Sequence, residues 1–126
     1  ARKLQLSTFA KNIAPYVKEE LRNADQSLQL GDYAAAFAHL ENAHVLGQES
    51  TYWHVVVHLR MLRWGLARND VKEVTGQVIR IIGAAALTAV KGVPVGNTGG
   101  SNISPLKTLP IKPELAEIIA RAKSKG

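Results

Sequence analysis

Apolar residues recur every three or four positions along most of this chain, a period typical of amphipathic α-helices. The first stretch with this pattern runs from Pro15 to Leu28. Proline suits the first turn of a helix, because its missing N–H would have no partner there. We therefore expect a helix that begins near Pro15, with an additional turn ahead of it over residues 7–14. Its apolar stripe consists of Val17, Leu21, Ala24 and Leu28.

Short turn sequences separate this stretch from three more helical stretches. Gly31 can take the left-handed conformation that ends a helix, and Asp32 can cap the helix that follows. Asn69 and Asp70 repeat this chemistry, and Ser50 or Thr51 can cap the helix between them. The predicted helices span residues 33–46, 52–67 and 71–89.

The last two of these helices differ in pattern. Residues 52–67 are apolar almost all round, which predicts a central position in the fold. Residues 71–89 instead carry a stripe at helical spacing, formed by Val71, Val74, Val78 and Ile81.

A weak internal repeat relates the two pairs of helices. The block from Leu30 to Ala43 resembles the core of a tetratricopeptide helix pair, and the block from Arg68 to Ile81 follows the same template. We therefore expect an all-α fold with two antiparallel tetratricopeptide-like hairpins, formed by residues 15–46 and 51–89.

A C-terminal helix over residues 113–123 should cover the face that two stacked hairpins leave exposed. Residues 91–112, which precede it, have no helical period and are rich in glycine and proline, so they predict a long loop. The length of the chain suits one domain, so residues 1–126 are expected to form a single helical unit.

The composition narrows the classes of function. The chain has no cysteine, which excludes disulfides, thiolate metal sites and thiol catalysis, and a cytoplasmic protein is the simplest interpretation. No apolar run approaches the roughly 20 residues that span a bilayer, so no membrane segment is expected. The net charge of +6 is spread along the helices and ends rather than concentrated on one basic face. Nucleic acid is therefore not the expected partner.

The histidines are the main candidates for chemistry, since all four lie between His39 and His58. His54 and His58 are four residues apart, so both face the same side of a helix. Glu41 and His44 form a second pair near the end of the preceding helix. If the two helices pack antiparallel, Glu41, His44, His54 and His58 can form one site for zinc, copper, nickel or ferrous iron. His39 lies about 140° from His44 around its helix and should point away.

Two other interpretations of the histidine cluster are a structural role and catalysis. Histidines inside small helical bundles often hydrogen-bond a carboxylate or a carbonyl and bind nothing, so Glu41 could simply belong to a buried polar network. Ser50 and Thr51 lie near the histidines, but no strand-turn-helix elbow presents a nucleophile and no aspartate is placed to orient a base. The sequence therefore favours a protein that is not an enzyme.

The glycine-rich segment after the fourth helix offers a second candidate region. It matches neither a Walker A motif nor a dinucleotide-binding fingerprint. Asn97, Thr98 and Gly99 are expected to shape a turn, or to form a lid over the histidine cluster. Arg80 would hydrogen-bond carbonyls of this loop, and Gln77 would serve as a buried polar partner, including for a histidine.

Several runs resemble the hallmarks of a small bacterial family, a domain of unknown function. They are HLENAHVLGQ at residues 39–48, the HxxxH pair of His54 and His58, and PVGNTG at residues 94–99. The resemblance covers roughly Pro15 to Ala120. It implies an all-helical cytoplasmic protein and brings no established catalytic residues with it.

Taken together, these patterns predict a small non-catalytic protein that binds a metal ion or a small ligand through its histidine and glutamate cluster. The alternative is a helical protein–protein interaction module with purely structural histidines. Two stacked hairpins leave an open end, and a second copy of the chain could cover it, so a homodimer is the simplest form of that alternative.

Overall fold

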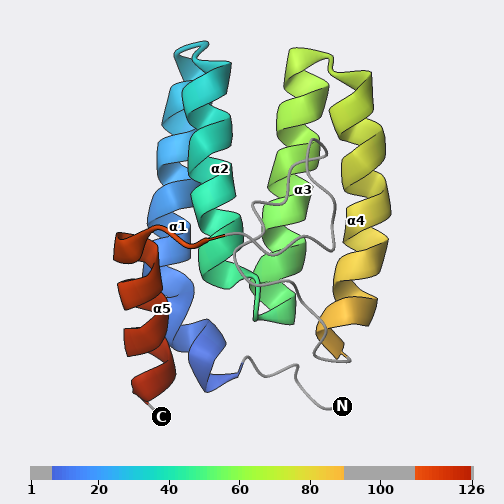
Figure 1. The fold of residues 1–126 in the computed structure, drawn as a ribbon. Helices are drawn as coiled ribbons and strands as arrows, with labels where there is room; N and C mark the ends of the chain where they lie inside the picture. The colour runs from blue at the N-terminus through green and yellow to red at the C-terminus, as the bar shows by residue number, and fades with distance from the viewer. Residues whose placement is uncertain (1–6, 90–109, 126) are drawn as a thin grey trace, which may run out of the picture.

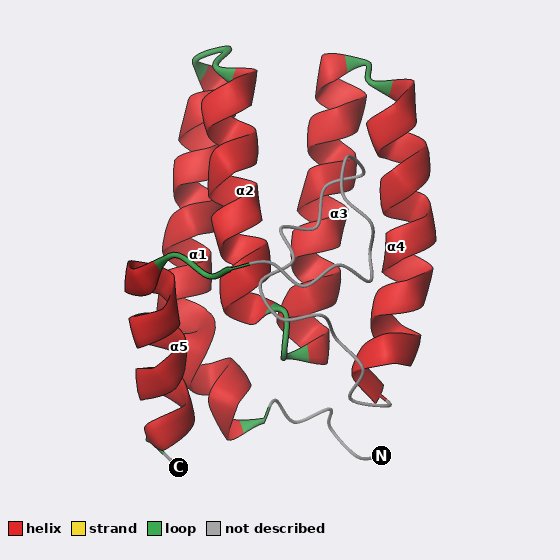
Figure 2. Ribbon diagram, in the orientation of Figure 1, coloured by secondary structure: helices red, strands yellow, loops and turns green. Residues whose placement is uncertain are grey.

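The computed structural model describes residues 7–89 and 110–125 of the chain, without the side chains of residue 82 and residues 84–89. This part contains five α-helices and no strands, so the prediction of an all-α fold is confirmed. Figure 2 shows the helices in red. The helices are α1 (Thr8–Gln29), α2 (Tyr33–Gly47), α3 (Thr51–Arg68), α4 (Val71–Ala89) and α5 (Pro113–Ser124).

The helices form two antiparallel hairpins that lie side by side (Figure 1). In the first, α1 packs along α2, and in the second, α3 packs along α4. The hairpins meet chiefly through α2 and α3, while α5 packs on α1 and α2. The predicted arrangement of two hairpins and a C-terminal helix is therefore confirmed, and its likeness to tetratricopeptide repeats stays a prediction. Residues 91–109 of the predicted long loop lie outside the described residues.

The turns within the hairpins follow the predicted chemistry. Gly31 has a φ of 77° and Asn69 a φ of 60°, so both take the left-handed conformation that ends a helix. Asp32 and Asp70 then cap the next helix, since each carboxylate accepts the backbone N–H three residues later at 3.0 Å. Each connection consequently reverses the chain within a few residues.

The start of α1 differs from the prediction, because the helix begins at Thr8 and Pro15 lies inside it. Ser7 provides the cap, since its hydroxyl accepts the N–H of Ala10 at 3.1 Å. The extension also buries Ala10 and Ile13 in the core. In Figure 1 the first turns of α1 lie at an angle to the rest, as expected for an interior proline, which leaves one carbonyl without its helical donor. Burial of these two apolar side chains offsets that loss.

The predicted central position of α3 is confirmed by its buried aromatic residues. The indole N–H of Trp53 donates to the carbonyl of Ala10 at 2.9 Å, and that of Trp64 donates to the carbonyl of Tyr33 at the same distance. Both indoles therefore bury their apolar rings with their single donor satisfied. Around them lies one core drawn from four helices, which includes Ile13, Val17, Leu21, Leu40, Leu46, Val57, Met61, Leu115 and Ile119.

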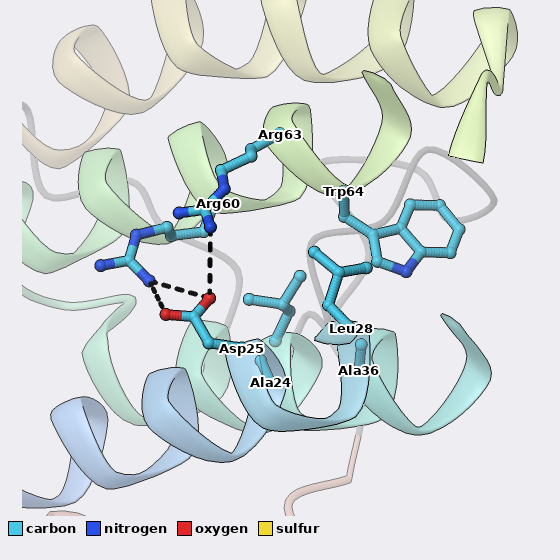
Figure 3. Close-up of a pocket in the computed structure, with 8 residues that line it drawn as sticks. Ala24, Asp25, Leu28, Ala36, Arg60, Arg63 and Trp64 are labelled. Atoms are coloured by element: carbon cyan, nitrogen blue, oxygen red, sulfur yellow. Dashed lines mark hydrogen bonds and ion pairs between the residues drawn. The ribbon is translucent and has the colours of Figure 1, made fainter. Parts of the chain in front are cut away.

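The joint between the hairpins is closely packed (Figure 3). Arg60 and Arg63 of α3 reach across to Asp25 of α1, at 3.3 and 3.9 Å. The hollow beside this cluster, next to Trp64 and Leu28, has a volume of about 10 Å³. A space of that size holds about one water molecule, so this joint is a packing interface rather than a ligand pocket.

Helix α4 turns an unexpected face towards the protein. Among the side chains of α4 that the structure describes, the buried ones are polar, namely Glu73, Gln77 and Arg80. By contrast Val71 and Val78, from the apolar stripe, are 75% and 46% exposed. A helix on the edge of a helical protein ordinarily buries its apolar stripe, so something polar on α3 must determine how α4 is rotated.

A tight contact at the end of α2 generates the first prediction. A Cβ atom added to Gly47 would lie 2.6 Å from the Cβ of Trp53, which cannot move without the backbone of α3. We expect Gly47→Ala to lower the free energy of unfolding by about 1–3 kcal/mol, the usual cost of overpacking. Urea denaturation measures the change.

Gly83→Ala in α4 is the matched control, because no described atom lies within 4 Å of its added Cβ. Alanine has a higher helix propensity than glycine, so the free energy of unfolding should rise by about 0.5–1 kcal/mol. Equal effects of the two substitutions would contradict a tight contact at Gly47.

Candidate functional site

Three histidines converge where the two hairpins meet. His44 lies in the last turn of α2, and His54 and His58 lie in the first two turns of α3. The intervening turn is short because Ser50 caps α3 at once, its hydroxyl accepting the N–H of Trp53 at 3.3 Å. Among the described residues, one potential ligand atom from each histidine lies within 4.8 Å of the other two, and all three side chains are buried.

Two of the rings already have a spacing that suits a shared ion. The Nε2 atoms of His44 and His58 are 3.2 Å apart. Two nitrogen ligands on a tetrahedral zinc ion lie roughly 3.3 Å apart, given zinc–nitrogen bonds of about 2.0–2.1 Å. His54 completes the cluster with its ring centre 4.9 Å from each of the other two.

Glu41, the fourth residue of the predicted site, is not part of this group. Its position three residues before His44 places it about 60° away around α2. There it lines a hollow between α2 and the segment leading into α5, beside Lys112 and Leu115. The structure thus brings together three of the four predicted residues, and Glu41 lies outside their cluster.

His39 lies apart from the cluster, as expected from its position on the helix. Its Nδ1 atom is 2.8 Å from the carboxylate of Glu20 on α1, and its side chain is one-third exposed. It therefore offers a natural control for experiments on the buried histidines.

Burial keeps two histidines of the cluster neutral. Burial, together with the smaller effect of the neighbouring His58, lowers the pKa of His54 to about 3. Burial also lowers the pKa of His58 to about 4, where the hydrogen bond to Gln77 opposes the shift and the charge of Arg80 adds to it. Both imidazoles are consequently neutral at pH 7, the form that binds metal ions.

Behind His58 stands a pair of polar side chains from α4. The Nδ1 atom of His58 is 2.6 Å from Oε1 of Gln77, and Nε2 of Gln77 donates to the carboxylate of Glu73. Gln77 thus contacts a histidine, the role that the sequence suggested for it. Glu73 was not among the predicted residues, although its position four residues before Gln77 on the same helical face was a usable signal.

The remaining predicted residues divide between the described and undescribed parts of the chain. Arg80 is buried on the same face of α4, where burial lowers its pKa and the carboxylate of Glu73 opposes that shift. Asn97, Thr98 and Gly99 lie outside the described residues, and so does any lid that they form.

The two shifted pKa values predict that acid destabilises the fold. The unfolded chain binds protons below the ordinary histidine pKa of about 6.5, whereas the folded chain resists them until about pH 4 at His58 and pH 3 at His54. Stability present above pH 6.5 is therefore lost as the pH falls. At pH 5 we expect a loss of about 2 kcal/mol for each of the two histidines, measured by urea denaturation at pH 7.5 and 5.

His54→Gln and His58→Gln should each flatten this pH dependence, because each removes one buried imidazole. A pH dependence that survives the double replacement of His54 and His58 would show that other groups cause it.

No described helix is both long enough and apolar enough to span a bilayer.

Comparisons with known proteins identify the family of the chain. No curated protein and no solved structure matches the chain significantly. One family model does match, over residues 11–119, which is most of the chain and includes the histidine cluster together with Gln77 and Glu73. The chain therefore belongs to the family described as "Protein of unknown function (DUF3703)".

Proposed function

We propose that this protein binds one transition-metal ion through His44, His54 and His58. The observation that carries the proposal is the convergence of three buried imidazoles whose potential ligand atoms lie within 4.8 Å of one another. Desolvating three polar rings costs free energy, and a bound ion would recover it through coordination bonds.

The geometry favours an ion over a small organic ligand. A gap of 3.2 Å between Nε2 of His44 and Nε2 of His58 admits a single coordinated atom and no larger group. Three imidazoles would leave one coordination position of a tetrahedral ion open, for water or an exchangeable ligand.

The ligand type narrows the choice of ion. Imidazole nitrogen suits zinc, copper, nickel and iron, whereas magnesium and calcium take oxygen ligands. Within the first group, affinity for nitrogen sites ordinarily rises from ferrous iron through nickel to copper(II) and falls again at zinc. We therefore expect copper(II) to bind most tightly in vitro, with zinc and nickel next.

Calorimetric titration of metal-stripped protein tests the proposal directly. Zinc, nickel and copper(II) should each bind in a one-to-one ratio, and magnesium should give no heat of binding. Replacing a residue that only hydrogen-bonds to a metal ligand ordinarily lowers metal affinity roughly 10–100-fold. His54→Ala/His58→Ala removes two of the three ligands, so its affinity should fall by more than that.

His39→Ala is the matched control and should bind like the unmodified protein, because its ring contacts Glu20 on the surface of the first hairpin. Circular dichroism must show that every variant is folded. If folded, unmodified protein binds none of these ions, the proposal is wrong.

The outer face of the second hairpin favours a second candidate function, association with another copy of the chain. Leu59 and Leu66 on α3 are 48% and 64% exposed. They lie two turns apart on one side of the helix, as do Val71 and Val78 on α4. Among the described helices α4 packs only on α3. This face would be covered if two copies packed through it about a twofold axis.

Light scattering after size-exclusion chromatography tests that association. The unmodified protein should elute as a dimer, and Leu66→Lys/Val78→Lys as a folded monomer, because buried lysines cost more than the apolar contact gains. Gln26→Lys, an exposed position on α1, should leave the dimer intact. An unmodified protein that stays monomeric up to millimolar concentration would rule out this candidate.

A further inference from the structure

The geometry points to Gln77 and Glu73 as positioning residues that hold His58 in the tautomer able to bind a metal ion. This inference rests on the proposed metal site and extends it from the three ligands to the residues behind them. It starts from an unbroken line of polar contacts, from Glu73 through Gln77 and His58 to His44.

The first step fixes the orientation of the Gln77 amide. An ionised carboxylate accepts hydrogen bonds and donates none, so the side of the amide that faces Glu73 must be its NH₂ group. The amide oxygen then faces the opposite way, towards His58. The carboxylate, rather than the histidine, thus decides which end of the amide meets the ring.

The second step fixes the proton on His58. The amide oxygen also accepts and does not donate, so Nδ1 of His58, 2.6 Å away, must carry the proton of the neutral ring. Its Nε2 atom is left with a free lone pair. That atom is the one that lies 3.2 Å from His44, on the side of the ring where the cluster converges.

The third step concerns the metal-free protein. Because Nε2 of His58 can only accept, Nε2 of His44 must carry the proton of the hydrogen bond between the two rings. A metal ion that binds to Nε2 of His44 would displace this proton, which would move to Nδ1 of the same ring so that the ring stays neutral. His58 needs no such change, since its lone pair already points to the site.

The arrangement also supplies charge. Glu73 is buried, with 6% of its surface exposed, and it is linked to His58 through a single amide. A cation held by three neutral rings needs a nearby negative group in a medium of low dielectric. Glu73 provides a negative charge behind His58, as carboxylates behind metal-bound histidines do, and the buried Arg80 on the same face of α4 offsets part of it.

Gln77→Leu tests the positioning role, because leucine fills a similar volume without an acceptor. Long-range ¹⁵N–¹H NMR of the metal-free protein reports which nitrogen of His58 carries the proton. The unmodified protein should show it on Nδ1, and Gln77→Leu should shift population to the Nε2–H form. Zinc affinity in calorimetry should fall about 10–100-fold, the usual effect of losing such a partner.

A swapped pair, Glu73→Gln/Gln77→Glu, is the rescue. It retains one carboxylate and one amide, and its new carboxylate at position 77 accepts the Nδ1 proton of His58. We expect the Nδ1–H tautomer to persist and zinc affinity to stay within a few-fold of the unmodified protein. Thr75→Val, at an exposed position of α4, controls for general effects of replacing a polar side chain on this helix.

The outcomes separate the two proposals. If the unmodified protein binds zinc but Gln77→Leu binds it equally well and keeps the Nδ1 proton, only the positioning role is overturned. If the unmodified protein binds no zinc, the metal site fails and the inference fails with it. If Gln77→Leu does not fold, the spectrum of the unmodified protein still decides, because a proton on Nε2 of His58 would contradict the inference.

Discussion

The second hairpin depends on one buried contact, the hydrogen bond between His58 of α3 and Gln77 of α4. Apolar packing alone would bury the apolar stripe of α4, yet Val71 and Val78 are exposed while Glu73, Gln77 and Arg80 are buried. A buried imidazole without a partner would cost more than a buried valine gains, because an unsatisfied polar group loses its hydration entirely. Satisfying His58 therefore determines how α4 is rotated, and the exposure of Val71 and Val78 is a consequence.

The contact requires an accurate register between the two helices, and the turn that joins them provides it. The left-handed Asn69 ends α3, and Asp70 both caps α4 and donates its N–H to the carbonyl of Gly65 at 2.8 Å. Gly65 in turn lets Val74 approach closely, since an added Cβ would lie 3.1 Å from a methyl carbon of Val74. A short turn and one close approach thus place Gln77 opposite His58.

Some of these features can be predicted from the sequence and others cannot. Local chemistry fixes the ends of helices, so Asp32 and Asp70 were identified as caps from sequence alone. The convergence of His44 with His54 also followed, because a tight turn separates the helices that carry them. The predicted start of the first helix at Pro15 is wrong. The preference of proline for a first turn is weaker than the combined effect of the cap at Ser7 and the burial of Ile13.

Other features depend on packing angles that no local pattern encodes. Glu41 and His44 share one side of a helix to within about 60°, and that margin decided which of them faced α3. The rotation of α4 was equally hidden, because the centre of its apolar stripe lies roughly 110° around the helix from the buried polar side chains. The sequence signal that could have revealed it is polar, namely Glu73, Gln77 and Arg80 at helical spacing of four and three residues.

The buried polar cluster lowers the stability of the metal-free protein, and this cost is informative about the function of the cluster. Three imidazoles, an amide, a carboxylate and a guanidinium occupy space that leucine and valine could fill with a gain in stability. Sequences that fold well break such local rules chiefly at functional positions. The cluster also draws on α2, α3 and α4, so an ion held there would tie the first hairpin to the second. Binding to the folded state alone stabilises that state in proportion to the logarithm of ion concentration. Metal binding would then offset the cost of the buried polar groups, and it would couple occupancy of the site to the way the two hairpins are joined.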